Sequence, residues 1–447
     1  MNANDVIFHR TRRRVLRFFV ALMCLSYLPF CVAVIADENT QLTESLELAH
    51  AVDIAVRDNP NLAEMQARYE ALTNIPSQVG ALPDPIVSFG AMNFPTDTFA
   101  RGQEPMTQLQ FGVNQKFPFP GKLGLREQAA EYDAIAAAYS VDEVRLQLVS
   151  GVKSRWWELF YLDRAIETVG ANQGLLKQFI TVAKTKYETG TGLQQDVLLA
   201  QLELSKLIDR NIQLNALRRD REIKLNVLMD QPTTNSLILP SKTSMLMPDL
   251  LGEQELSQKA GAVRPLLDKM ETQVNAAQSR LELAKRDYYP DFMLGATYGE
   301  RTGNNPPIVG GTRSDFLSLM LSVNVPIFLD RKQSKAVSQR SSELRSHEYA
   351  LIDERSLVMG QVSSAVTDYE RARKQHGLFK TGILPQARQT VQSMLAGYQV
   401  DEVDFLNLVG SQITLFNYEL EYWKALVEAN QALARLEATV GEEDIYE

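Results

Sequence analysis

Side chains able to carry out chemistry are few and scattered in this sequence. Beyond the first 36 residues the chain holds three histidines, His50, His347 and His376, and each stands alone in a helical pattern. None has a histidine, cysteine or carboxylate at a spacing that forms a known metal site. Phosphate loops, GxSxG elbows and dinucleotide fingerprints are missing from the sequence. The sequence therefore predicts neither an enzyme nor a resident cofactor, and we interpret the histidines as surface or packed helical residues.

Two methionines and the charge balance narrow the choices further. Met92 and Met106 flank a loop between two predicted strands, and thioethers can contact soft metal ions. Ordinary loop residues give the same pattern, which is the interpretation we favour. The formal net charge is −9, with no basic run outside the N-terminus. Nucleic-acid binding is therefore not expected, because it normally requires a basic face.

The N-terminus is typical of a secretory signal. Five arginines between Arg10 and Arg17 precede an apolar stretch over 18–35, and Ala36 ends an acceptable cleavage site. We predict a signal peptide over 1–36; the alternative is an uncleaved anchor, since 18 residues can just span a bilayer. Both cysteines, Cys24 and Cys31, fall in this segment. A lipoprotein signal at Cys31 is disfavoured by the bulky residue before it, so the mature chain is expected to lack disulfides.

The rest of the chain is a duplication. Short motifs recur in the same order at a slowly growing separation, which is hard to obtain by chance. The matching pairs, at separations of 205, 207, 208 and 211, are Asn59-Pro60 with Arg264-Pro265, Leu82-Pro83-Asp84 with Tyr289-Pro290-Asp291, Phe117-Pro118 with Val325-Pro326, and Tyr187 with Tyr398. The sequence predicts a first repeat over 37–240 and a second over 241–447.

Each repeat reads as a helix, two strands and a very long helical hairpin. The first helix is expected over 42–79, with a break near Asn59-Pro60, and its counterpart over 255–287. The stretch 122–186 contains no proline and would be roughly 95 Å long as a helix. Apolar residues along it recur at spacings of 3, 4 and 7, which indicates coiled-coil or helical-barrel packing.

The hairpin tips are predicted over 187–196 and 398–404. In the first tip, Gly190 can supply the positive φ that lets a helix stop and reverse. Asp401 takes the corresponding place in the second tip, and aspartate tolerates the left-handed region better than most residues.

Four strands are predicted over 86–92, 107–117, 292–299 and 315–326. The last three alternate apolar and polar residues, as transmembrane barrel strands do, whereas the run over 86–92 is shorter and less regular. A soluble sheet packed on a core gives the same alternation. Four strands cannot close a barrel, so either the sheet is soluble or several chains share one barrel. The polar residues expected to face a barrel lumen are Gln110, Asn114, Lys116, Ser318, Ser322 and Asn324.

These features together resemble the TolC family of outer-membrane efflux proteins, over nearly the whole mature chain. The resemblance is carried by the duplicated unit, the tip motif over 187–201 and the Pro118-Phe119-Pro120-Gly121-Lys122 step after a strand. The segments 80–85, 92–95 and 117–122 are most similar to the heavy-metal (Cus/Czc-type) branch of the family.

The resemblance implies a mainly α fold with a β-barrel portion. Three protomers would each give four strands to a twelve-stranded barrel in the outer membrane, and their helices would form a tunnel across the periplasm. It also implies two partners, a periplasmic adaptor and an inner-membrane pump, commonly proton-driven, and it implies no cofactor. The adaptor would dock at the tips, here Gly190, Thr191, Gly192, Leu193, Val400, Asp401, Glu402 and Val403.

Family channels often narrow at the periplasmic end through acidic residues on the second hairpin. At the corresponding positions this chain has Asn407 and Gly410, which carry no charge. The nearby acidic residues Asp401, Glu402 and Asp404 are therefore candidates for the aperture, together with Asn407. A ring of three such carboxylates would attract cations and exclude anions. The alternative is that they are solvated charges complementing a helix dipole.

The function expected from the sequence is a passive exit duct for heavy-metal cations. A duct for drugs or for type I secretion is an alternative within the same class. A periplasmic coiled-coil adaptor or scaffold is the alternative from another class, although a scaffold would need neither the four strands nor the second repeat.

Overall fold

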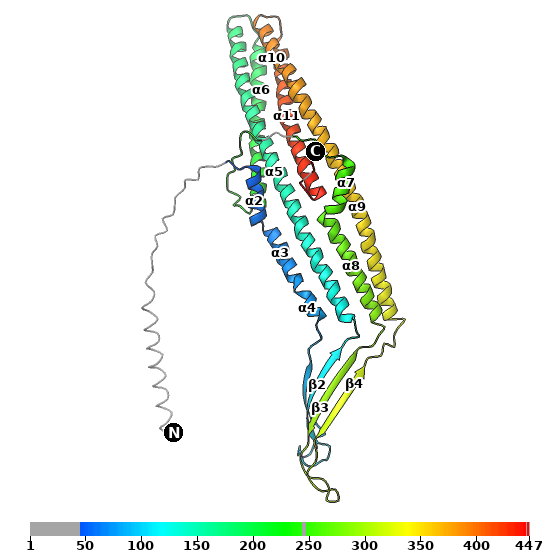
Figure 1. Ribbon diagram of the computed structural model, residues 1–447. Helices are drawn as coiled ribbons and strands as arrows, with labels where there is room; N and C mark the ends of the chain where they lie inside the picture. Colours follow the sequence, from blue (N-terminus) through cyan, green and yellow to red (C-terminus); the bar gives the residue numbers. More distant parts are fainter. Residues whose placement is uncertain (1–44, 244–246, 444, 447) are drawn as a thin grey trace, which may run out of the picture. The chain divides into compact units, whose positions relative to one another are not determined.

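The computed structural model describes residues 45–243, 247–443 and 445–446, and the part from Ser45 onward forms one unit. The predicted signal peptide over 1–36 lies outside the described residues. Within the unit from Ser45, the strands lie at one end of the helices and the two hairpin tips at the other (Figure 1).

The first repeat opens with three short helices, α2 (Leu48–Asp58), α3 (Pro60–Thr73) and α4 (Ile75–Gly80). The predicted break at Asn59 is present: its side-chain oxygen accepts hydrogen bonds from the backbone N–H groups of Asn61 and Leu62 and so caps α3. A second break, at Asn74, was not predicted. Pro76 stands in the first turn of α4, where its missing N–H is tolerated, and there it begins a new helix.

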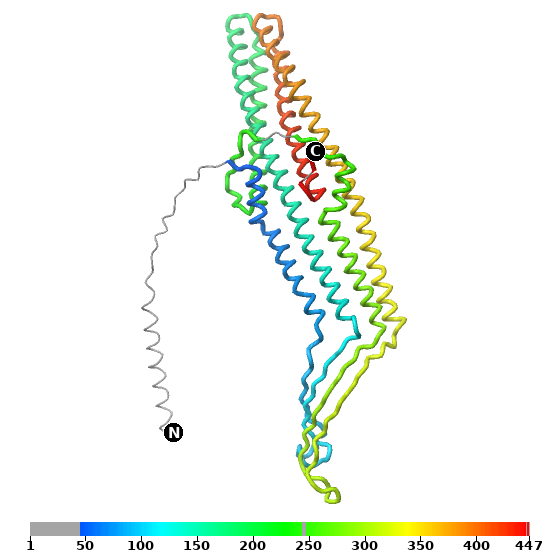
Figure 2. The backbone as a smooth tube through the Cα atoms, in the orientation of Figure 1, coloured from blue at the N-terminus to red at the C-terminus, as the bar shows by residue number. Residues whose placement is uncertain are grey.

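The first long hairpin consists of α5 (Lys122–Glu188) and α6 (Gln194–Leu228), and Figure 2 shows their backbones running side by side. The 67 residues of α5 confirm the predicted continuous helix, which also extends two residues beyond the predicted end. The second repeat begins with α7 (Glu253–Val263) and α8 (Pro265–Arg286), which meet at the predicted proline.

The second hairpin is α9 (Gln333–Leu378), a π-helical turn η1 (Phe379–Ile383), α10 (Leu384–Gln399) and α11 (Phe405–Val440). The sequence analysis did not predict this local change in helical geometry within the first arm. Pro385 lacks the N–H that would bond to the carbonyl four residues earlier. The wider π turn just before it accommodates that loss.

The strands form one antiparallel sheet in the order β1 (Ile86–Met92), β2 (Gln108–Phe117), β3 (Phe292–Glu300) and β4 (Phe316–Val323). Strand β4 is shorter than predicted. Its ladder stops where the Asn324 side chain accepts from the Asp291 N–H and the Asn324 N–H donates to the Asp291 carbonyl at 3.2 Å. Pro326, which follows, has no N–H to extend the ladder.

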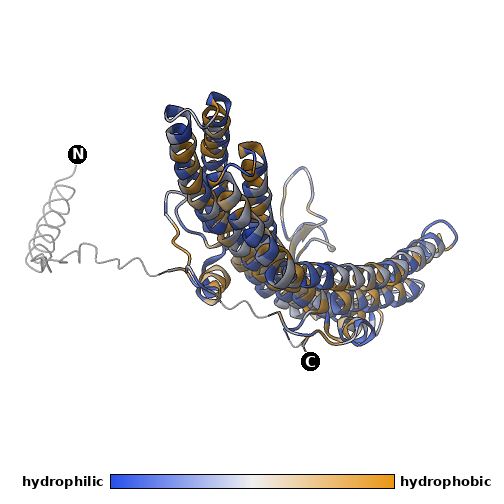
Figure 3. Ribbon diagram, turned by 90° about the horizontal axis from the view of Figure 1, so that it is seen from above, coloured by the Kyte–Doolittle hydropathy of each residue, from blue (hydrophilic) through white to orange (hydrophobic). Residues whose placement is uncertain are grey.

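The largest core lies where the short helices cross α5. Trp156 is fully buried, stacks on Phe160 at 5.7 Å between ring centroids, and donates from Nε1 to the Leu46 carbonyl at 2.8 Å. Leu46 in turn donates its backbone N–H to the Ile238 carbonyl at 2.8 Å, so this core also holds the segment linking the repeats. Hydrophobic and hydrophilic residues mix along the long helices, as their packing on one face requires (Figure 3).

A buried carboxylate ties the same linking segment to α6. Glu222 is 2% exposed and accepts from Arg218 at 3.0 Å, from Arg219, and from the Leu237 N–H at 2.6 Å. Arg218 also donates to Asp163 of α5 at 2.6 Å. Burial raises the pKa of Glu222, but the hydrogen bonds from Leu237, Arg219 and Arg218 outweigh it and hold this pKa below its usual range. The group therefore stays ionised and acts as a structural clamp.

Candidate functional site

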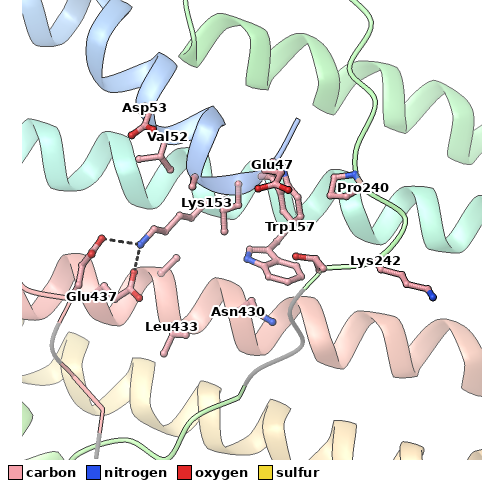
Figure 4. A pocket seen from close by; sticks show the side chains of 16 residues that line it. Glu47, Val52, Asp53, Lys153, Trp157, Pro240, Lys242, Asn430, Leu433 and Glu437 are labelled. Atoms are coloured by element: carbon pink, nitrogen blue, oxygen red, sulfur yellow. Dashed lines mark hydrogen bonds and ion pairs between the residues drawn. The ribbon is translucent and has the colours of Figure 1, made fainter. Parts of the chain in front are cut away.

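Two regions carry the features expected of a channel subunit, the pair of hairpin tips and the four-stranded sheet. A cavity of about 770 Å³ lies between these two regions (Figure 4). It is lined by the first turns of α2, the middle of α5 and the last turns of α11. Lys153 reaches across it to Glu437 at 2.6 Å and to Glu443 at 3.2 Å. One ammonium thus faces two carboxylates, so this part of the cavity wall carries a net negative charge.

The first tip is a tight turn built on glycine. Gly190 has φ +76°, and the backbone N–H groups of Thr191 and Gly192 both donate to the Lys186 carbonyl at 2.9 Å. A Cβ on Gly192 would lie 2.7 Å from the Lys186 Cβ, so no side chain fits there without a shift. Thr191 and Leu193 are exposed at the turn.

The second tip reproduces this turn with an aspartate. Asp401 has φ +66°, which confirms that it adopts the left-handed conformation of Gly190. The Glu402 N–H donates to the Gly397 carbonyl at 2.9 Å, matching the turn of the first tip. Val400, Asp401 and Glu402 are exposed and Val403 is half-buried against Gly397.

A lysine joins the two tips within one chain. The Lys186 ammonium donates to the Tyr398 carbonyl at 2.6 Å, pairs with the Asp401 carboxylate and lies 4.5 Å from the centre of the Tyr398 ring. Tyr398 packs on Phe405 in the core beneath. Burial, with the nearby Asp196 carboxylate, raises the pKa of Tyr398 to about 12. Sequence reasoning missed this contact because its partners lie 215 residues apart.

The predicted aperture residues differ in their surroundings. Asp401 is engaged by Lys186, whereas Glu402 and Asp404 are exposed and form no ion pair with any residue that the structure describes. Asp404 stands at the N-cap of α11 without a side-chain capping bond, and Asn407 lies exposed one turn further on. Asp404 and Asn407 thus share one open face of α11.

One face of the sheet is apolar and open. Two rows cross all four strands in register: Phe89, Phe111, Tyr298 and Leu317 in one, and Val87, Val113, Ala296 and Leu319 in the other. Their large side chains are mostly well exposed, reaching 77% for Val87 and 80% for Leu319. An exposed apolar face of this extent calls for an apolar environment.

The opposite face carries many small and polar residues, together with the larger apolar residues Ile86, Met92, Met293, Phe316 and Met320. Ser88, Gly112, Thr297 and Ser318 form one row across it. All the predicted lumen residues within the strands lie on this face, namely Gln110, Asn114, Lys116, Ser318 and Ser322. Asn324 lies just beyond β4 and bonds to the backbone of Asp291.

A buried lysine fixes the corner between sheet and helices. Lys122, the first residue of α5, donates to the Asp291 carboxylate at 2.9 Å and pairs with Asp287 at 3.2 Å. The Phe119 N–H donates to the same Asp291 carboxylate at 3.0 Å. The sequence singled out the segment ending in Lys122, but it did not reveal that its partner is the aspartate of the other repeat.

The residues considered for metal chemistry are dispersed. His50 is exposed, His347 is half-buried, and His376 is buried with its ring 4.7 Å from that of Tyr422. Met92 and Met106 are exposed at the ends of the first strand loop. Across the described residues, no group of three or more His, Cys, Asp or Glu side chains is arranged to hold a metal ion. Over the same residues, no helix is long and apolar enough to cross a membrane.

Comparison with known proteins gives a family match over part of the chain. The family model of the outer membrane efflux proteins matches residues 256–442, within the second repeat. The resemblance predicted from the sequence is confirmed. The cobalt-zinc-cadmium resistance protein CzcC of Cupriavidus metallidurans is 25% identical over 207 residues, which are 45% of this chain and 44% of CzcC. The match thus spans less than half of the length of CzcC.

Solved structures extend the likeness to most of the chain. CusC, described as forming a transmembrane channel, matches with a TM-score of 0.74 at 14% identity, covering 90% of this chain and 93% of CusC. The outer membrane protein VceC of Vibrio cholerae matches with a TM-score of 0.73 at 17% identity, covering 88% of this chain and 96% of VceC. At such identities the likeness shows the fold, and it confirms the mainly helical chain with a four-stranded portion that the sequence predicts.

Proposed function

We propose that three copies of this chain form the exit duct of a tripartite efflux system in the outer membrane. The observation that carries the proposal is the four-stranded sheet, with an exposed apolar face, a polar face behind it and unpaired edges at β1 and β4. Lipid would cover the apolar face, and the polar face would line an aqueous lumen. Twelve strands from three chains would close the sheet, as four from one chain cannot.

The cargo in this proposal is heavy-metal cations. The support is the sequence match to CzcC, a cobalt-zinc-cadmium resistance protein, together with the motifs shared with the heavy-metal branch. The duct itself does no chemistry, so the work comes from an inner-membrane pump, in our proposal a proton-driven one. A periplasmic adaptor connects the two and docks on the hairpin tips, where Leu193 and Val400 offer exposed apolar side chains.

Two measurements test this assignment. Size measurement of protein extracted by detergent from the outer-membrane fraction should give a trimer, whereas a soluble periplasmic monomer would refute the duct and favour a scaffold. A deletion strain should become sensitive to cobalt, zinc or cadmium. If the strain instead becomes sensitive to drugs or fails to secrete a protein, the chain would still be an exit duct, but its cargo would be a drug or a secreted protein and not metal cations.

Substituting Asp404 with asparagine is expected to lower the preference of the channel for cations. Three copies of this exposed carboxylate, unpaired among the described residues, would concentrate cations at the periplasmic end. We expect the cation-to-anion permeability ratio in planar bilayers to fall, because the substitution removes one ring of carboxylates from the aperture. Glu188→Gln, which removes an exposed carboxylate from the end of α5, is the matched control. Unchanged selectivity in Asp404→Asn would exclude this residue from the filter.

A further inference from the structure

A slot of about 270 Å³ lies between the two hairpins, where α5 and α6 of the first pack against α11 of the second (Figure 1). Apolar side chains from all three helices form its walls, among them Leu176, Leu207, Phe416 and Leu420. We propose that the slot binds a small amphiphilic anion, with a hydrogen-bond donor at one end, an apolar body and a carboxylate at the other end. Such a site is independent of the cargo that the duct carries.

The inner end of the slot holds an acceptor that lacks a donor. Gln412 lines the slot and is 3% exposed, and its Oε1 has no hydrogen-bond partner among the described residues. Its Nε2 donates to Asn172 Oδ1 at 2.6 Å. Buried polar atoms are nearly always paired, so an unpaired one beside a slot marks a place where a further molecule can bind.

The orientation of the Gln412 amide is fixed by its neighbours. The Thr168 carbonyl can only accept, so the Asn172 side chain turns its Nδ2 toward that carbonyl, at 2.9 Å. Asn172 then presents Oδ1 to Gln412, which has to donate to it from Nε2. The Gln412 oxygen is left over, and a ligand must supply a hydroxyl or an N–H group to pair with it.

The mouth of the slot carries a positive charge. Arg210 lines the slot, is exposed, and forms neither an ion pair nor a hydrogen bond with any residue that the structure describes. Lys206 and Glu203, the other charged residues of the lining, pair with each other at 2.6 Å. The guanidinium therefore remains available, and its planar set of donors suits a carboxylate.

The size and walls of the slot define the body of the ligand. Its volume of about 270 Å³ falls just below the range of about 300–1,000 Å³ that is typical of small-molecule sites, so a single ring with a short arm suits it. Phe416 and the leucines favour an aromatic or aliphatic body. A positive charge at the outer end of the ligand would be repelled by Arg210. A hydroxylated aromatic carboxylate is therefore the class that meets all three requirements.

Binding of 3-(4-hydroxyphenyl)propanoate tests the slot. This probe carries a phenol donor, one ring and a carboxylate on a flexible arm. We would titrate it by isothermal calorimetry into the mature protein in lipid nanodiscs, where no free detergent competes for the slot, with empty nanodiscs as the blank. Saturable binding of one molecule per chain is expected. The analogue without the hydroxyl, 3-phenylpropanoate, and the analogue without the carboxylate, 4-ethylphenol, should each bind about ten-fold more weakly.

Two variants locate the bound probe. Arg210→Gln removes the charge at the mouth, and Gln412→Met keeps the length of the side chain while removing the acceptor. Each should weaken the binding of the probe about ten-fold. Arg210→Gln should also bind the probe no better than 4-ethylphenol, and Gln412→Met no better than 3-phenylpropanoate.

The matched control is Gln201→Met. Gln201 is the counterpart of Gln412 in the first repeat, 211 residues earlier, and it is exposed. Circular dichroism checks that each variant is folded. Arg210 lies on the surface, so its variant still tests the site if Gln412→Met fails to fold.

Each outcome decides for or against the site. Weaker binding in Arg210→Gln and Gln412→Met, with Gln201→Met unchanged, supports it. Absence of saturable binding to the wild type would overturn it, since the slot would then hold water alone. Unchanged binding in Arg210→Gln, or equal binding of 3-phenylpropanoate, would also overturn it. If the protein proves to be a soluble monomer, the same titrations apply in plain buffer, because the lining residues all belong to one chain.

Discussion

Replacing Glu222 with alanine is expected to destabilise the chain by about 3–5 kcal/mol, the range for removing one partner of a buried ion pair. The variant removes the carboxylate that balances the positive charges of Arg218 and Arg219. It also removes the acceptor of the Leu237 N–H. The linking segment would then detach from α6. Urea unfolding of the detergent-extracted protein, followed by tryptophan fluorescence, measures the change. The three tryptophans, Trp156, Trp157 and Trp423, all lie in or against the adjoining core.

The control for this variant is Glu188→Ala, which removes an exposed carboxylate 3.7 Å from Lys184 at the end of α5. Such a surface pair contributes at most about 1 kcal/mol. The pKa of Glu222 is held low in the folded chain, so its contribution is present above the unfolded value near 4.5 and is lost as the pH falls through the folded value. The difference between wild type and Glu222→Ala should therefore shrink on acidification. A difference independent of pH would contradict the ionised clamp.

Trp156→Ala is expected to lower the free energy of unfolding by about 3–5 kcal/mol, because the smaller side chain leaves a cavity in the core. The side chain is fully buried and contacts both Phe160 and the carbonyl of Leu46. Trp156→Phe keeps most of the ring volume but leaves the Leu46 carbonyl without its hydrogen-bond donor. It should therefore lower the free energy of unfolding by about 1–3 kcal/mol. Circular dichroism of the helices during urea unfolding compares the two without relying on the altered fluorophore. Equal losses in both variants would show that the hydrogen bond, not the packing, dominates.

Local signals in the sequence predicted the elements well. Three signals were read directly from the sequence: the asparagine and proline at the start of α3, the absence of proline along α5, and the alternation in β2 and β3. The equivalence of Asp401 and Gly190 was also visible, since it depends only on a backbone conformation that aspartate tolerates.

What the sequence could not predict depends on distant partners. The pairing of Lys122 with Asp291 and of Lys186 with Asp401 joins opposite repeats, and nothing in a single sequence links such residues. The early end of β4 likewise follows from a side chain, Asn324, that bonds to the neighbouring strand instead of extending the ladder. The roles of the tip and lumen residues remain predictions, because they concern adaptor, lipid and cargo.

The π turn η1 has a consequence for the length of the second hairpin. Buried residues before and after it follow spacings of 7, 8, 7 and 7, in the order Tyr369, His376, Leu384, Val391 and Tyr398. The turn thus absorbs one surplus residue that would otherwise rotate everything beyond it by about 100°. Deleting one residue within 379–383 would leave an ordinary helix with its buried stripe aligned. The same deletion a few turns later would rotate Tyr398 away from Lys186. This arm can therefore lose a residue without disturbing its buried face only within the π turn.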